Sequence, residues 1–154
     1  MRELDPFLAE LLRQIPEAVQ TKDSPAVEER LFSPPAVPEE DEICAEWKLY
    51  VEPELRRLFQ TATETVREDL AQLLCTAKPF ANCSLSIPLA HADAWLSGLN
   101  QARLAITASN GFTQDELSDQ YRSPLGSRRD LSLFQVNFYG FLQEMILREI
   151  DPPN

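Results

Sequence analysis

The sequence predicts an all-α fold, a single-domain bundle of five to six helices with proline-rich linkers and at most one short extended segment. Apolar residues recur every three or four positions in several long stretches, as they do on one face of a helix. The 12 prolines, against 4 glycines, stand mostly where those stretches begin, and a fixed φ with no N–H suits the first turn of a helix. A chain of 154 residues has the length of one domain, so we expect residues 1–154 to fold as a unit.

The first part of the chain contains two short predicted helices and a linker. Pro6 opens the first helix, and Pro25 opens the second, which ends near Phe32. Residues 33–41 are rich in proline and then acidic, so we expect them to cross the surface as an extended linker. The acidic end of this linker suits the first turn of a helix that runs towards Tyr50, because negative charge is stabilised there by the helix dipole.

The clearest predicted helix opens at Pro53 and ends before a loop around Pro79. Its apolar stripe consists of Leu55, Phe59, Ala62, Val66, Leu70 and Leu73. Residues 84–88 then alternate between polar and apolar and are the one strand-like stretch of the sequence. Pro88 lacks the N–H that a sheet requires, so the sequence predicts no more than a short extended segment there.

Two long helices are predicted in the second half of the chain. The first spans residues 89–109 and ends at Asn110-Gly111, a strong signal for a helix C-terminus. Residues 113–116 form a capping box that opens a short helix. A polar loop at 122–129 leads to the last helix, over residues 130–150.

The net charge of −11 disfavours nucleic acid as a partner. Residues 1–54 alone carry fourteen acidic against five basic side chains, and such a surface repels a phosphate backbone. Arg122, Arg128 and Arg129 are the one local cluster of positive charge, and we interpret them as part of a solvated loop.

The cysteines and the absence of long apolar runs predict a cytoplasmic protein. Cys44, Cys75 and Cys83 are odd in number and unrelated in spacing, which argues against a disulfide framework and indicates a reducing compartment. The sequence has no basic and apolar leader, and no apolar run approaches the roughly 18 residues of a membrane span. We therefore expect no contact with a membrane.

The sequence contains no pattern that predicts a catalytic residue, a metal ion or a cofactor. His91 is the only histidine, the cysteines do not form a Cys-x-x-Cys unit, and there is no glycine-rich phosphate loop. Because His91 stands near the start of a predicted helix, we expect it to be a capping or surface residue.

One charged residue interrupts the apolar stripe of the helix predicted over 89–109. On a helical wheel Arg103 falls inside the edge of the stripe, and Asn100 lies just outside it. In the structural interpretation, Arg103 extends to solvent or forms an interhelical ion pair. In the functional interpretation, it faces a cleft together with Asn100 and holds an anionic ligand or peptide. Glu144 on the last helix pairs either with Arg148, one turn further along the same helix, or with Arg103 on the helix predicted over 89–109.

The predicted last helix is apolar on two faces. The main stripe consists of Leu131, Phe134, Phe138, Phe141, Leu142 and Met145, and further apolar residues on the far side are Leu133, Val136 and Leu147. A helix of this kind is either buried centrally or shared with another subunit, which makes a homo-oligomer through this helix one of our expectations.

Residues 94–104 read Ala-Trp-Leu-Ser-Gly-Leu-Asn-Gln-Ala-Arg-Leu and resemble a bacterial family of helical domains, the domain of unknown function 2017. Its members carry a Trp-Leu-x-x-Leu-Asn-x-x-Arg-Leu element and end in a helix like residues 139–144. Many continue the first element into Gly-Thr-Arg, where this chain has Ile-Thr-Ala at 106–108. The gene of some members lies beside that of a Clp-protease adaptor, so the resemblance implies a protein partner linked to Clp-type proteolysis. It also implies a polar cluster formed by Trp95, Asn100, Arg103, Gln143 and Glu144.

Three hypotheses for the function follow. The first is a noncatalytic protein-interaction or regulatory module. The second is a binder of a small molecule or anion, or an enzyme, that uses a cleft around Asn100, Arg103 and Glu144. The third is a transcriptional regulator, which would require a basic recognition surface.

Overall fold

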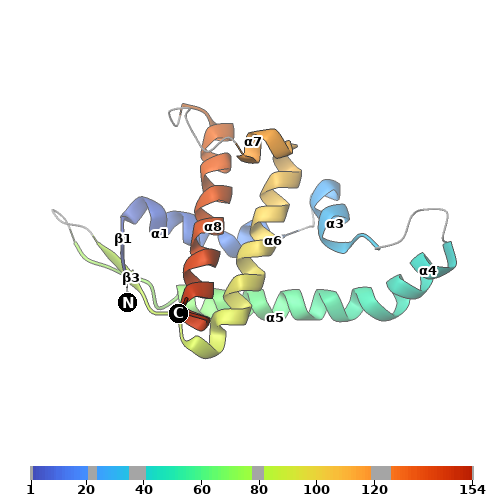
Figure 1. Cartoon of the computed structure of the whole chain (residues 1–154), viewed down its shortest axis with the longest axis horizontal. Helices are drawn as coiled ribbons and strands as arrows, with labels where there is room; N and C mark the ends of the chain where they lie inside the picture. The colour runs from blue at the N-terminus through green and yellow to red at the C-terminus, as the bar shows by residue number, and fades with distance from the viewer. Residues whose placement is uncertain (1, 21–23, 35–40, 78–81, 119–125, 154) are drawn as a thin grey trace.

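Helix α6 (Ala92–Asn110) runs through the middle of the fold and packs against α8 (Arg128–Ile150), α5 (Glu52–Leu70) and α3 (Pro25–Phe32) (Figure 1). The structure is a computed structural model and describes residues 2–20, 24–34, 41–77, 82–118 and 126–153. The buried residues of α6 are Ala92, Trp95, Gly98, Leu99, Gln101, Ala102, Ala105 and Ile106. Because α6 has neighbours on several sides, much of its circumference is apolar or small.

The N-terminal segment packs across α6 and α8. It contains strand β1 (Arg2–Leu4), α1 (Pro6–Arg13) and α2 (Ile15–Ala18). The side chain of Asp5 caps α1 by accepting a hydrogen bond of 2.8 Å from the N–H of Phe7, and Pro6 occupies the first turn as predicted. The buried Tyr139 hydroxyl donates a hydrogen bond to the carbonyl of Leu11, which fixes α1 on α8.

A single long helix replaces the two helices predicted before and after Pro53. Helix α4 (Asp41–Glu46), the π-helical turn η1 (Trp47–Val51) and α5 follow one another without a break. The N–H of Glu52 bonds to the carbonyl of Trp47, five residues earlier. This wider turn lies directly before Pro53, whose ring would collide with the preceding turn of a regular α-helix. A proline that usually opens a helix is therefore accommodated inside one.

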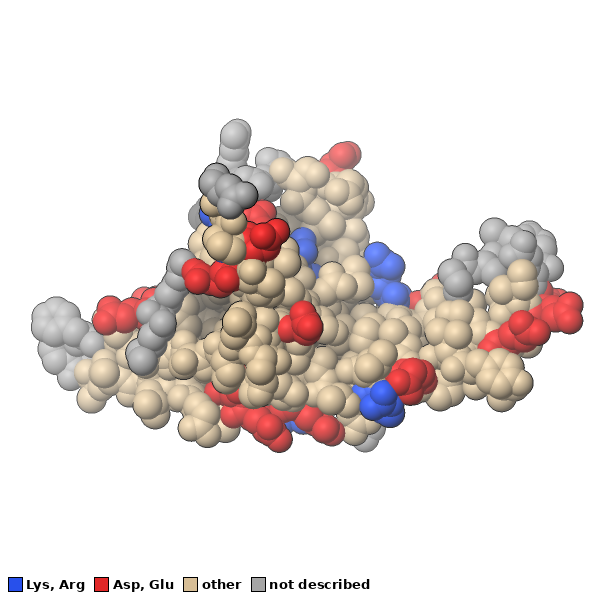
Figure 2. All heavy atoms as spheres, turned by 60° about the horizontal axis from the view of Figure 1, so that its bottom comes forward, with Lys and Arg blue, Asp and Glu red and all other residues tan. Residues whose placement is uncertain are grey.

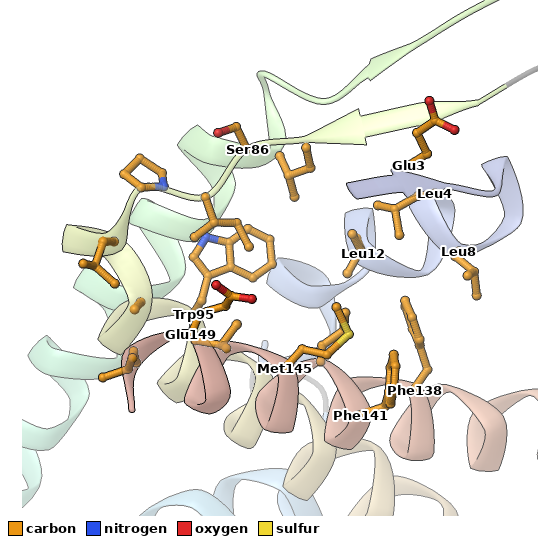
Figure 3. A pocket seen from close by; sticks show the side chains of 18 residues that line it. Glu3, Leu4, Leu8, Leu12, Ser86, Trp95, Phe138, Phe141, Met145 and Glu149 are labelled. Carbon is orange, nitrogen blue, oxygen red and sulfur yellow. The ribbon is translucent and has the colours of Figure 1, made fainter. Parts of the chain in front are cut away.

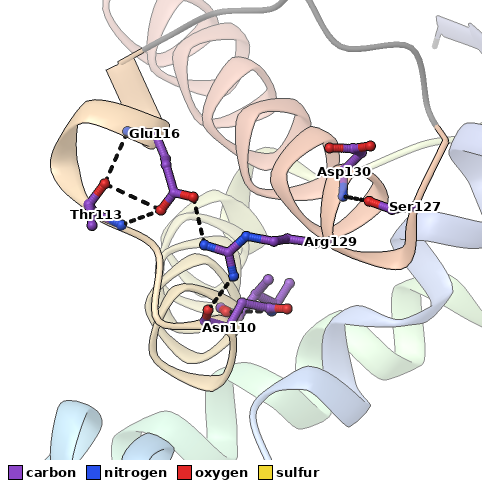
Figure 4. A network of polar contacts seen from close by, with 7 residues as sticks. Asn110, Thr113, Glu116, Ser127, Arg129 and Asp130 are labelled. Carbon is purple, nitrogen blue, oxygen red and sulfur yellow. Dashed lines mark hydrogen bonds and ion pairs between the residues drawn. The ribbon is translucent and has the colours of Figure 1, made fainter.

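The end of α6 and the start of α8 are joined by a polar network (Figure 4). Gly111 ends α6 with a φ of 61°, as the sequence predicts. Helix α7 (Gln114–Ser118) follows, and its capping box is confirmed because Glu116 accepts a hydrogen bond of 2.8 Å from the N–H of Thr113. Arg129 donates to the carbonyl of Asn110 and to the carboxylate of Glu116, both at 2.6 Å. Arg129 was expected in a solvated loop, and it lies instead in the first turn of α8.

The helical fold class is confirmed, but the extended structure exceeds the prediction. Strands β1, β2 (Leu74–Cys75) and β3 (Cys83–Leu85) form an antiparallel sheet in the order β1-β3-β2. Only the segment of β3 was expected, because β1 and β2 are too short to show an alternating pattern. No helix in the described part of the chain combines the length and the apolar composition that a bilayer crossing requires.

The expectation that the cysteines form no disulfide is wrong. Cys75 and Cys83 are direct partners in the β2–β3 register, with their Cα atoms 4.0 Å apart, and they form a disulfide. Antiparallel pairing brings the two residues face to face, a proximity that their sequence spacing does not reveal. Cys44 is not part of a disulfide.

The two faces predicted for the last helix are also corrected. The buried residues of α8 are Gln135, Val136, Phe138 and Tyr139. Val136, predicted on the far side, is in the core, and Phe141, predicted in the main stripe, is exposed. The rest of the main stripe packs as predicted, since Phe138 is buried and Leu131, Phe134 and Leu142 pack against the core, so the packed face of α8 extends over part of both predicted faces.

Reduction of the disulfide should lower the free energy of unfolding by about 2 kcal/mol, because the bridge closes a short loop in the unfolded chain. The measurement is urea unfolding with and without a phosphine reductant. The variant Cys44→Ala keeps the bridge and should keep the same response to the reductant. An identical unfolding midpoint in both conditions would contradict the pairing of Cys75 with Cys83.

Candidate functional site

A groove of about 770 Å³ lies along the C-terminal half of α8 (Figure 3). Its other walls are the N-terminal segment of β1 and α1 and the stretch that connects β3 to α6. The side chains that define these walls are Leu4, Leu8, Ile87, Leu89, Phe141 and Met145. Segments from both ends of the chain thus meet at one predominantly apolar surface.

Several of the apolar side chains in this groove remain accessible to water. Leu89 is 72% exposed and Phe141 is 57% exposed. Exposed apolar surface that gathers in a groove, rather than being scattered, is typical of a site that binds another molecule. The groove is therefore the strongest candidate for a functional site.

Trp95 lines the groove although almost none of its surface is exposed. Its indole N–H donates a hydrogen bond of 2.8 Å to the carboxylate of Asp69, a buried residue near the end of α5. The Nδ1 atom of His91 donates to the same carboxylate at 2.9 Å. A buried carboxylate is costly unless hydrogen bonds compensate for the lost water. The two hydrogen bonds to Asp69 compensate for that lost water, and they hold the end of α5 against the start of α6.

The charged side chains of the groove are acidic. Among the lining residues, all of which belong to the described ranges, the charged ones are Glu3 and Glu149. Asn82 donates a hydrogen bond of 3.2 Å to Glu3, so the Glu3 carboxylate is held in place. The whole chain has a net charge of −11, and Figure 2 shows a face on which acidic side chains are widespread and basic ones are few. The charged groups among these lining residues are therefore negative.

The structure brings together two residues of the polar cluster that the family resemblance implies. Arg103 donates a hydrogen bond of 2.7 Å to the side-chain oxygen of Gln143, and Gln143 donates in turn to the carbonyl of Leu96 at 3.2 Å. The guanidinium lies against Gly140, where an added Cβ would be 3.3 Å from it. The Arg103 Nε atom is buried without a hydrogen-bond partner. Arg103 thus joins α6 to α8 at a close approach that glycine permits.

The other members of that cluster lie elsewhere. Asn100 is exposed on α6, and Glu144 is exposed on α8. Glu144 pairs with Arg148 within the helix at 3.9 Å, as the spacing predicts, and not with Arg103. Of the five implied residues, Trp95 alone lines the groove, so the groove and the Arg103–Gln143 contact are separate features.

Sequence reasoning missed the partnership of Asp69 with His91. His91 was expected to be a capping or surface residue. It stands at the N-cap position of α6 with its side chain 37% exposed, but that side chain bonds to Asp69 and makes no capping hydrogen bond. A signal was present in the sequence, because Asp69 stands three residues after Val66 and four before Leu73, on the apolar stripe of α5. Within the described ranges, no group of three or more His, Cys, Asp or Glu side chains could hold a metal ion.

In a comparison with protein families, residues 2–150 match the family model described as Domain of unknown function (DUF2017). This is the family that residues 94–104 resemble. Neither the curated proteins nor the solved structures contain a match to the chain.

The variant Asp69→Ala should lower the free energy of unfolding by about 2–4 kcal/mol, because it leaves the buried Trp95 N–H without an acceptor. Urea unfolding followed by tryptophan fluorescence measures the change. The neighbouring exposed residue provides a control, since Glu68→Ala should change the stability by no more than about 0.5 kcal/mol. Equal effects of the two variants would show that Asp69 does not hold α5 to α6.

Proposed function

The chain belongs to the DUF2017 family, and for this member we propose a noncatalytic protein-interaction function in which the groove binds an amphipathic helix of a partner protein. The apolar face of that helix would lie against α8, and lysine or arginine side chains would flank it. The observation that carries the proposal is the exposed apolar groove whose charged lining residues are both acidic. Apolar contact supplies affinity in such a complex, and charge selects the partner.

The length of the groove supports a helix as the occupant. The lining residues of α8 extend from Phe138 to Ile150, which corresponds to about 18 Å along the helix axis, or roughly three turns. Three turns of a partner helix present apolar side chains at i, i+3 or i+4, and i+7, the usual set of anchors for a helix in a groove.

The chemistry of the lining favours binding over catalysis and over nucleic acid recognition. Most of the lining is hydrocarbon, which binds through exclusion of water and transfers no protons. A transcriptional regulator would need a basic surface. Of the three arginines that could form such a surface, Arg129 donates hydrogen bonds to the carbonyl of Asn110 and the carboxylate of Glu116. Arg122 lies outside the described residues.

A fluorescein-labelled peptide of 15 residues with leucine at helical spacing and lysine on the other positions is a direct probe of the groove. Phe141→Ser should weaken its binding about tenfold or more, because a large apolar anchor is lost. The matched control is Leu147→Ser, since Leu147 is 52% exposed on the same helix but does not line the groove. That variant should change the dissociation constant less than about twofold, by fluorescence anisotropy.

The contribution of charge is tested by a second peptide in which glutamate replaces lysine. It should bind at least about tenfold more weakly at low salt, and the difference should shrink as salt screens the acidic residues. The proposal is abandoned if both peptides bind equally, or if Phe141→Ser and Leu147→Ser weaken binding to the same extent.

A further inference from the structure

The Cys75–Cys83 disulfide presents one of its two residues to solvent and buries the other. Cys75 in β2 is exposed, whereas Cys83 in β3 has no exposed surface and belongs to the main core cluster. A thiolate that opens a disulfide must reach one of its two sulfur atoms. Cys75 is therefore the side from which another molecule reaches this bridge.

Arg13 lies beside the exposed half of the disulfide. It is the last residue of α1, and its Nη2 atom is 3.8 Å from the Sγ atom of Cys75, which lies 62 residues further along the chain. The Nη1 atom donates to Glu10 at 3.4 Å, which leaves the Nη2 side turned towards the sulfur. A guanidinium attracts an incoming thiolate and stabilises a departing one. Arg13 therefore favours thiol–disulfide exchange at Cys75.

The disulfide attaches a very short edge strand to the sheet. Strand β2 has two residues and pairs with β3 at the edge of the sheet. Leu74, its other residue, is 71% exposed, so β2 gains little from burial of apolar surface. Strands of this length are marginally stable without further support. The covalent bond is thus a large part of what holds β2 against β3.

Strand β3 connects the disulfide to the groove. It is the central strand of the sheet, and Cys83 is the register partner of Cys75 on one side and of Leu4 on the other. Leu4 lines the groove (Figure 3), and so do Leu85 and Ile87, which follow Cys83 along the chain. A change in how β3 is held therefore acts on a wall of the groove.

We propose that Cys75–Cys83 is an exchangeable disulfide, that its reaction partner is a dithiol protein reductant, and that its reduction weakens binding at the groove. The part that concerns binding rests on the function proposed for the groove. In the oxidised chain β2 is bonded to β3, so the wall formed by β3 and β1 is held in the shape that the partner helix fits. In the reduced chain β2 is released, and that wall loses its support on one side.

The exchange takes place in two steps. One thiolate of the reductant attacks the Sγ atom of Cys75, a mixed disulfide forms, and Cys83 leaves as a thiolate that takes up a proton in its apolar surroundings. The second thiolate of the reductant then attacks the reductant sulfur of the mixed disulfide, and Cys75 leaves as a thiolate next to Arg13. The two thiols of the reductant are oxidised to a disulfide, and their two electrons reduce the bridge of this chain.

The rate of reduction tests the exchange site without reference to the groove. A Cys44→Ala chain is mixed with dithiothreitol or thioredoxin, and free thiols are counted by alkylation and mass spectrometry. Arg13→Gln should slow reduction about fivefold, and Arg13→Lys should keep most of the rate because it keeps the charge. The matched control is Arg57→Gln, which removes the same charge from a side chain paired with Glu54 on α5 and should leave the rate unchanged.

Two results would overturn the exchange site. One is an equal rate for Arg13→Gln and Arg57→Gln. The other is a rate of reduction that equals the rate of global unfolding, measured in urea, because the bridge would then open only in the unfolded chain.

The coupling to the groove is measured with the labelled leucine–lysine peptide. Its dissociation constant for the Cys44→Ala chain should rise about tenfold on reduction and return on reoxidation. A chain that also carries Cys75→Ala and Cys83→Ala should bind as weakly as the reduced chain, with or without reductant. Equal binding by oxidised and reduced chains would overturn the coupling alone. Failure of the oxidised chain to bind would overturn the proposed function and the coupling with it, while the rate of reduction still decides the exchange site.

Discussion

The carboxylate of Asp69 is the buried constraint that joins α5 to the wall of the groove. It is buried, and it is satisfied by the indole of Trp95 and the ring of His91. These hydrogen bonds fix the end of α5 to the start of α6, so the direction of α5 is set relative to the central helix. Trp95 also lines the groove. One polar contact therefore ties a wall of the groove to α5, because unpaired charge in the core would be costly.

Two surfaces of this protein differ in how the chain builds them. The groove forms where both ends of the chain meet the segment after β3, and the Cys75–Cys83 disulfide lies in the adjoining sheet. Residues 41–61 form the exposed first part of the long helix, which contains a π-helical turn and no buried residue. A groove assembled from several segments suits a partner of a defined shape.

Local interactions explain the parts of the fold that could be predicted. The capping box at Thr113 and the glycine at position 111 act within a few residues, so they are visible in the sequence and are confirmed. The pairing of Glu144 with Arg148 is local in the same way. The partners of Arg103 and Asp69 lie 40 and 22 or more residues away, and nothing in the periodicity of one helix identifies a residue on another. The candidate site was missed for that reason.

The sequence by itself determined the helical class and the positions of most helix ends. It also determined that the last helix carries more apolar surface than a helix on the exterior of a protein requires. Those properties follow from periodicity, capping and proline placement, all of which operate over one or two turns. Tertiary structure alone decided which apolar residues are buried. Packing of α8 against α6 and α1 turned Val136 inward and left Phe141 in an open groove. The same kind of long-range contact paired Cys75 with Cys83, because proximity across a hairpin is set by strand register and not by sequence spacing.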